Sequence, residues 1–269
     1  MPVRAFFVRW LGREMCRKEV DVTKKLYPLF SFLVICVIWQ ALVSGLKVPP
    51  YFLPGPLAVG HALVADGGVL WHHALTTFYE SAVGLVIASV VALITGLILD
   101  AWRWLYNFIY PLLVISQTLP VMVLGPLLIL WFGFDLTPKV ILVVLMSFFP
   151  IVVALVAALQ DVPEEQIQFL QTMGASRLEV YRTLKLPLGM VGFFSGLKVA
   201  ATYCVGGAVV GEWLNAESGL GYYMIRAKNG FEIDKVFAAI VWVVVLSLLF
   251  NVLAGWLARG YHWTLTHSK

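Results

Sequence analysis

Apolar runs of about 20 residues recur along this chain and constrain its fold more than any other feature. Hydrophobic residues make up 61% of the sequence and charged residues 13%, and the mean hydropathy is +0.88. A helix crosses the hydrocarbon core in a run of this length because it satisfies every backbone polar group internally, where no water is available. The sequence therefore predicts an all-α integral membrane protein, and its composition argues against a soluble domain.

We expect six transmembrane helices, separated by turns and loops. Prolines at Pro49-Pro50 and in Leu53-Pro54-Gly55-Pro56 predict that the segment after the first helix is a loop. A second loop lies between the last two helices. The expected helices are 26–46, 76–99, 107–132, 138–159, 188–211 and 235–257; the loops are 47–75 and 212–234, and tails occupy 1–25 and 258–269.

Positive charge is distributed unevenly between the two sides of this predicted bundle. With six spans both termini lie on one side, which carries 13 Lys and Arg residues, whereas the opposite side carries five. Cytoplasmic segments of membrane proteins carry the excess of Lys and Arg. The pattern therefore predicts that both termini, and the polar segment 161–187, are cytoplasmic.

The segment 161–187, DVPEEQIQFLQTMGASRLEVYRTLKLP, is the longest polar interruption between the predicted spans. Asp161–Glu164 and Ser176–Glu179 each have the spacing of a helix N-cap and its N3 acid. Gly174 suits the end of the first helix, and Pro187 is expected to close the second. We predict two short amphipathic helices that offer an apolar face to a partner. A linker resting on the lipid surface is the alternative.

This segment resembles the EAA loop of ABC importer permeases, the cytoplasmic element that inserts into the ATPase subunit. The resemblance rests on Gly174-Ala175-Ser176 followed by Leu-Pro at Leu186-Pro187. Gln168, Phe169 and Leu170 occupy the family's Glu-Ala-Ala positions, so the triplet that names the loop is absent. The residues that the resemblance assigns to ATPase coupling are Gln168, Met173, Gly174, Ala175, Ser176, Leu184, Leu186 and Pro187.

Three further stretches resemble permeases of the nitrate, sulfonate and taurine family. They are Leu53-Pro54-Gly55-Pro56, the run PVMVLGPLLILWFG at 120–133, and Gly211-Glu212-Trp213 with the SGLGY sequence at 218–222. The chain is identified as a member of this binding-protein-dependent family. Its amino-acid sequence in SGLKVAATYCVGGAVVGEW and GLGYYMIRA is most similar to that of permeases for thiamine precursors of the hydroxymethylpyrimidine type.

The resemblance implies a type I ABC importer permease (MetI-like) fold in a bacterial plasma (inner) membrane. It also implies partners: a second permease subunit in a homodimer, two ABC ATPase subunits that bind ATP and Mg, and an extracytoplasmic substrate-binding protein. The sequence contains no G-x-x-x-x-G-K-[ST] phosphate loop, so we expect no ATPase activity in this chain, and no nucleic-acid partner.

Prolines in the third and fourth predicted spans free backbone carbonyls, which favours helices that line a pathway, although tightly packed helices could also carry them. Small residues in the fifth span allow close helix packing. Ionisable groups within a membrane are functional candidates, so Glu80 and Glu212 could flank an external gate or the binding-protein surface. The alternative is that both reach headgroups or water. The pathway candidates are Ser116, Gln117, Thr118, Pro120, Tyr203, Glu80 and Glu212.

Apart from Lys198, which we expect near the cytoplasmic end of its span, no Lys or Arg lies deep in any predicted span. A dehydrated anion would find little compensating charge there, which favours a neutral or cationic heterocycle as substrate. Nitrate, a sulfonate or taurine is the alternative substrate. The candidates for the surface facing the binding protein are Ser218, Gly219, Leu220 and Gly221. We expect no metal site from His61, His72 and His73.

Two other functional classes, an ion-driven secondary transporter and a membrane enzyme, would need features that differ from those of a permease. An ion-driven secondary transporter would need a deep carboxylate or a repeat with broken helices. A membrane enzyme would need a cluster of His, Asp and Glu at the interface, and the tail offers only His262 and His267.

Overall fold

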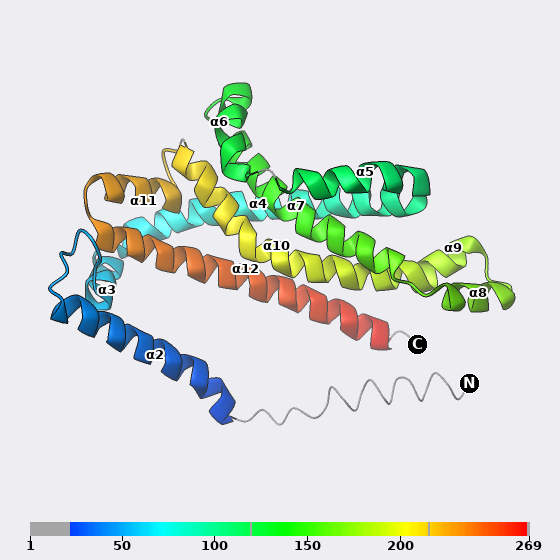
Figure 1. Cartoon of the computed structure of the whole chain (residues 1–269), viewed down its shortest axis with the longest axis horizontal. Helices are drawn as coiled ribbons and strands as arrows, with labels where there is room; N and C mark the ends of the chain where they lie inside the picture. Colours follow the sequence, from blue (N-terminus) through cyan, green and yellow to red (C-terminus); the bar gives the residue numbers. More distant parts are fainter. Residues whose placement is uncertain (1–21, 119, 215, 268–269) are drawn as a thin grey trace.

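The computed structural model describes residues 22–118, 120–214 and 216–267, and its regular secondary structure there is helical throughout (Figure 1). One short π-helical turn, η1, lies between α9 and α10. The helices are α2 (Val22–Gly45), α3 (Pro56–Ala65), α4 (Gly67–Ala101), α5 (Arg103–Ser116), α6 (Val121–Phe132), α7 (Leu136–Gln160), α8 (Glu164–Thr172), α9 (Arg177–Val180), η1 (Tyr181–Lys185), α10 (Leu186–Leu214), α11 (Leu220–Asn229) and α12 (Ile233–His267).

Four helical segments in the described part of the chain are long and apolar enough to cross a membrane. They are α4, α7, the continuous run Arg177–Leu214 through α9, η1 and α10, and α12 as far as Tyr261. The pair α5 and α6 would make a fifth if it counts as one broken span. The six-span topology and the cytoplasmic termini therefore stay predictions, since these helices are identified by length and composition alone.

The tightest packing in the molecule joins α10 to α7, because glycines on α10 face the backbone of α7. A Cβ atom at Gly196 would lie 2.5 Å from the carbonyl oxygen of Pro150 and 2.7 Å from the Cα atom of Ile151. At Gly192 it would lie 2.4 Å from the carbonyl oxygen of Ala154. Small residues allow this approach, and dispersion between the two backbones then stabilises the pair in lipid.

Helix α4 packs on α7 in a similar way, and α12 packs on α10 (Figure 1). Gly84 and Gly96 on α4 leave room for side chains of Val143 and Leu155 on α7. The ring of Phe78 on α4 stacks on a ring of α12, with centroids 5.1 Å apart. Helices α4, α7, α10 and α12 therefore form one packed core. The residues buried in that core include Ala92, Leu99, Ile151, Val152, Leu155, Ala200, Ala201, Cys204, Ala208 and Phe250.

The segment 107–132, predicted as one span with several prolines, is divided into two helices, α5 and α6, which meet at 98°. The chain leaves α5 at Gln117, and the hydroxyl and N–H of Thr118 both donate to the carbonyl oxygen of Ile115. Pro120 then takes the N-cap position of α6 with extended backbone angles. Proline has no N–H to continue the first helix, so the two helices separate there.

Both predicted loops contain helices. Within 47–75, Gly55 is the N-cap of α3 and Pro56 its first residue, a position that proline favours. The prolines that predicted a break therefore also start a helix. Helix α4 begins at Gly67, well before the predicted 76, and within 212–234 the chain forms α11.

The segment 161–187 forms two short helices, as predicted, but two of its boundaries differ. Ser176–Glu179 is a capping box and Gly174 has a φ of 87°, so these two features are confirmed. The N-cap of α8 is Pro163 rather than Asp161, which ends α7. Pro187 does not end the second helix. The π-helical turn η1 precedes Pro187. In an α-helix a proline ring clashes with the preceding turn and offers no N–H, and the wider π-helical turn accommodates it.

We predict that Gly196→Ala destabilises the protein by about 1–3 kcal/mol, because the added methyl group would overlap the backbone of α7. Gly206→Ala on the same helix is the matched control, since a Cβ atom there has no neighbour within 4 Å. We expect it to be neutral or slightly stabilising, because alanine favours the helix. Thermal unfolding of both purified variants in detergent measures the difference, and equal melting temperatures would contradict the α7–α10 contact.

Candidate functional site

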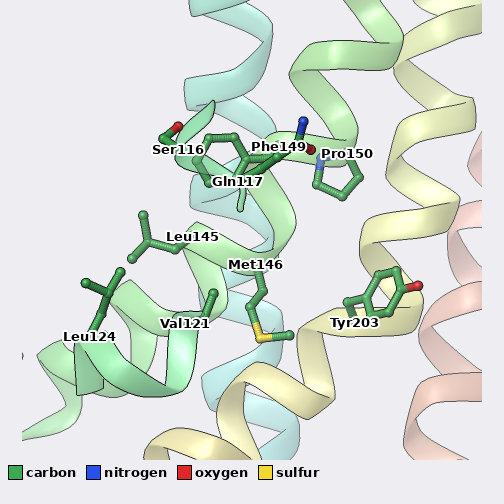
Figure 2. Close-up of a pocket in the computed structure, with 9 residues that line it drawn as sticks. All are labelled: Ser116, Gln117, Val121, Leu124, Leu145, Met146, Phe149, Pro150 and Tyr203. Carbon is green, nitrogen blue, oxygen red and sulfur yellow. The ribbon is translucent and has the colours of Figure 1, made fainter. Parts of the chain in front are cut away.

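Three of the predicted pathway residues line one cavity of about 310 Å³ at the break between α5 and α6 (Figure 2). Ser116 and Gln117 come from the end of α5, and Tyr203 comes from α10. Side chains of α6 and α7 complete the wall. These are Val121, Leu124, Leu145, Met146, Phe149 and Pro150.

The walls of this cavity are mainly apolar, with a few polar groups that can orient a ligand. Gln117 supplies an amide, and Tyr203 supplies a phenol whose residue is 52% exposed. The Ser116 hydroxyl donates to the carbonyl oxygen of Leu113 at 2.9 Å, so its oxygen can still accept a hydrogen bond. Pro150 has no N–H to donate to the carbonyl of Met146 four residues earlier. Such a cavity suits a small, flat ring with polar edges.

Four predicted pathway residues lie outside this cavity. Thr118 and Pro120 belong to the turn between α5 and α6, and the Thr118 hydroxyl is used within that turn. Glu80 and Glu212 lie in a separate buried cluster that joins α4, α7, α10 and α11. The structure therefore divides the predicted pathway set into a cavity and a buried polar cluster.

Glu80 in this polar cluster forms a buried ion pair with Lys139 on α7. The Lys139 Nζ atom lies 3.0 Å from Glu80 Oε1, and the Glu80 side chain is 1% exposed. The charge of Lys139 was counted on the external side, at the start of the predicted span 138–159. In the structure it lies in the first turns of α7 and packs against Gly211, and its partner Glu80 was not foreseen. The sequence shows an acid near the start of the span 76–99 and a base near the start of the span 138–159. It does not show that these two ends lie side by side, so the ion pair could not be predicted.

Glu212 accepts hydrogen bonds from two other elements. Thr77 Oγ1 on α4 donates to Glu212 Oε1 at 2.7 Å, and the N–H of Gly221 donates to Glu212 Oε2 at 2.5 Å. Gly221 lies in the first turn of α11, where backbone N–H groups have no partner within the helix. Glu212 therefore anchors the start of α11. Neither Glu212 nor Glu80 lines the cavity at the break between α5 and α6.

Gly219, Leu220 and Gly221, which we predicted to face the binding protein, are all buried within this chain. Their N–H groups donate inward: Gly219 to His73 Nδ1 at 3.0 Å, and Leu220 to Thr77 Oγ1 at 2.9 Å. Gly219 has a φ of 115°, and a Cβ atom there would lie 2.2 Å from the Glu212 carboxyl carbon. Only Ser218 of the four candidates is partly exposed.

A second polar contact ties α11 and α12 to the turn between α3 and α4. The Tyr223 hydroxyl donates to Asp66 Oδ2 at 2.6 Å, and the Lys235 Nζ atom lies 3.3 Å from the same oxygen. The hydrogen bond from Tyr223 lowers the pKa of the Asp66 carboxyl below its usual range. Burial, and then the hydrogen bond to Asp66, raises the pKa of Tyr223. Within the described residues, His, Cys, Asp and Glu form no group that could hold a metal ion.

At the opposite end of the bundle, α8 and α9 project beyond the core helices (Figure 1). Gln168, Met173, Gly174 and Ser176 are exposed there, and Ala175 is partly exposed. Leu184 lines a shallow groove of about 340 Å³ with Phe169, Leu170 and the stems of Glu165 and Gln166. Leu186 and Pro187 begin α10 and are half-buried.

A partly buried ion pair holds the base of this projecting segment to α4. The Lys185 Nζ atom lies 2.8 Å and 3.0 Å from the two carboxylate oxygens of Asp100, whose side chain is 1% exposed. Gln160, the last residue of α7, donates to Asp100 at 3.2 Å. The ends of α4, α7 and η1 therefore share one polar junction.

Comparison with known proteins identifies the family. Residues 84–263 match the model of the "Binding-protein-dependent transport system inner membrane component" family. A probable ABC transporter permease of Haemophilus influenzae is 35% identical over 240 residues, which cover 89% of this chain and 98% of that protein. The formylaminopyrimidine transport permease ThiX of Halalkalibacterium halodurans is 34% identical, covering 83% of this chain and 90% of that protein.

Other relatives are named as permeases for riboflavin, aliphatic sulfonates, taurine and nitrate. The fold resembles a chain of the MetNI methionine ABC transporter in an inward-facing conformation. The TM-score is 0.57 at 20% identity, with 74% of this chain and 96% of that chain covered. The chain therefore belongs to the family of binding-protein-dependent inner membrane components, the permease subunits of ABC importers, as its resemblance to that family predicted.

Proposed function

We propose that this chain forms half of the transport pathway of an ATP-driven importer and that the segment 161–187 couples it to a separate ATPase. A second, identical copy would supply the other half. Two ATPase subunits would bind ATP and Mg, and an extracytoplasmic binding protein would deliver the substrate.

The observation that carries the proposal is the form of the projecting segment. A helix that packs only within its own chain would cover its apolar side chains, yet Phe169, Met173 and Leu178 are exposed on α8 and α9. Its second helix, α9, continues without interruption through η1 into α10, which lines the cavity through Tyr203. Movement at a docked α9 would therefore reach the cavity wall through continuous helix.

We propose a small heterocycle such as a thiamine precursor as the substrate. The aromatic and amide groups of the cavity, at Phe149, Gln117 and Tyr203, suit a flat ring with hydrogen-bonding edges. The name of the ThiX relative supports the same class. Nitrate, a sulfonate or taurine is the alternative, supported by the names of the more distant relatives.

Affinity purification of the tagged chain from mild detergent, with mass spectrometry of the proteins that accompany it, tests the assembly. We expect an ATPase subunit with a phosphate-binding loop. Uptake by vesicles that hold an ion gradient but no ATP should fail. A clean chain with no ATPase, together with uptake driven by the gradient alone, would instead support an ion-driven secondary transporter.

We predict that Gly174→Val or Gly174→Pro leaves the protein inserted but abolishes the coupling of transport to ATP. Valine and proline cannot adopt the φ of 87° found at Gly174 without strain, so the angle between α8 and α9 must change. Gly174→Asn is the matched control, because asparagine tolerates this conformation, and it should keep most of the activity. The measurement is ATPase stimulation by the loaded binding protein. Full stimulation in the valine and proline variants would contradict the role of the loop.

We also predict that Lys185→Asp uncouples the importer, because it places two carboxylates at the junction of α4 and η1. Losing one partner of a buried pair costs about 3–5 kcal/mol. The double variant Asp100→Lys/Lys185→Asp restores the pair with reversed sign and should recover part of the activity. If the double variant were no better than Lys185→Asp alone in the ATPase assay, the pair would not be what holds the loop.

A further inference from the structure

The exposed face of α10 is polar, which is unusual for a helix in the core of a membrane protein. The exposed residues in its middle turns are Ser195, Lys198, Val199, Thr202 and Tyr203. They recur at spacings of three and four residues, so they form one stripe. This polar stripe continues to Tyr203, which lines the cavity in Figure 2.

The exposed faces of the neighbouring helices α4 and α12 differ from this polar stripe. Their middle turns expose only aliphatic side chains, as a surface in contact with lipid tails should. These residues are Val86, Ile87, Val90, Val91 and Ile94 on α4 and Val241, Val244, Val245, Leu248 and Leu249 on α12. The contrast within one molecule indicates that the polar stripe of α10 does not face lipid.

Lys198 decides between the two environments more sharply than the hydroxyl residues do. Ser195 and Thr202 donate to backbone oxygens four residues earlier, at 3.0 Å and 3.2 Å, so either hydroxyl is tolerated in lipid. An ammonium group cannot be satisfied within its own helix turn. Charged side chains inside membrane segments face the bundle interior or a water-filled cavity.

Lys198 lies near the middle of its span rather than near the cytoplasmic end, where sequence reasoning placed it. Its Cα atom is about 20 Å along the helix from Lys185 in one direction and about as far from Glu212 in the other. These two residues belong to the polar junctions at opposite ends of the bundle. The sequence argument against an anionic substrate assumed that no Lys or Arg lies deep in the membrane. The depth of Lys198 removes that assumption.

No ion pair joins Lys198 to an acid in the part of the chain that the structure describes. The stem of Lys198 lies beside Gly255 on α12, 3.6 Å from the position of an added Cβ atom. Asn251 on α12 donates its amide to the Lys198 carbonyl at 3.3 Å and to Thr202 Oγ1 at 3.0 Å. The chain therefore fixes the backbone and stem of Lys198 and leaves its charge without a carboxylate.

We propose that Lys198 gives the transport pathway a positive potential and selects substrates that carry a negative charge or strong hydrogen-bond acceptors, against cations. The inference rests on the proposed function, since it takes the polar stripe of α10 as a wall of the pathway. This proposal replaces the interpretation that a neutral or cationic substrate fits the pathway better than an anion. A positive pathway accepts an anion or a neutral ring with acceptor atoms, and it disfavours a cation. Ring nitrogens and carbonyls, sulfonates and phosphates share this acceptor chemistry.

Charged thiol reagents test the potential without knowledge of the substrate. In a chain with Cys16, Cys36 and Cys204 replaced by alanine, Thr202→Cys places a reporter one turn from Lys198. Native membrane vesicles holding the assembled importer are treated with methanethiosulfonates carrying either a sulfonate or a trimethylammonium group, and rates are normalised to a free thiol. We expect Lys198→Gln to lower the ratio of anionic to cationic reaction rates about three- to tenfold. Lys198→Arg should preserve the ratio.

A matched control separates the two proposals. Val245→Cys on the lipid-facing side of α12 should react with neither reagent. If the reporter at Thr202→Cys also reacts with neither reagent, with or without ATP, the polar stripe faces lipid or a second copy, and its place in the pathway is overturned. If the reporter reacts but Lys198→Gln leaves the ratio unchanged, the pathway stands and the role of Lys198 is overturned.

Discussion

The close contact between α7 and α10 is the interaction on which the rest of the molecule depends. Gly192 and Gly196 bring α10 against the carbonyls of Ala154 and Pro150, so that backbone meets backbone. Within lipid there is no hydrophobic force between helices, and packing of this kind supplies the attraction. Because α7 and α10 are fixed in register, Tyr203 and Met146 line the same cavity, and the polar stripe of α10, which includes Tyr203, is left exposed.

Ion pairs hold the two ends of this core. Glu80 and Lys139 join α4 to α7 at one end, and Asp100 and Lys185 join α4 to η1, just before α10, at the other. A buried pair is not a strong source of net stability, but a register shift that separates its charges is costly. The two junctions therefore limit how the helices can slide. The proposed ATPase contact, α8 with α9, lies beyond one of them.

Helix α10 carries two surfaces of different chemistry. Glycines and alanines face α7, and the polar stripe with Lys198 is exposed beside Asn251 of α12. Its first turns continue into the projecting segment through η1. One helix thus connects the proposed ATPase contact, the cavity and the charge of the pathway, which explains why substitutions on its different faces are expected to affect stability, coupling and selectivity separately.

The sequence by itself determined the membrane setting, the helical class, the capping box at Ser176–Glu179, the turn at Gly174 and the family. These depend on residues close together in the chain, where spacing and composition report local structure directly. It did not determine that Lys139 pairs with Glu80, that the Glu212 carboxylate accepts the N–H of Gly221 at the start of α11, or that Lys198 lies at mid-depth on an exposed stripe. Those facts depend on which helix faces meet. The pairing of faces is set by backbone contacts such as Gly196 against Pro150, which only the tertiary structure decided, because a glycine in a span looks the same whether it packs against a helix or faces open space, as Gly206 does.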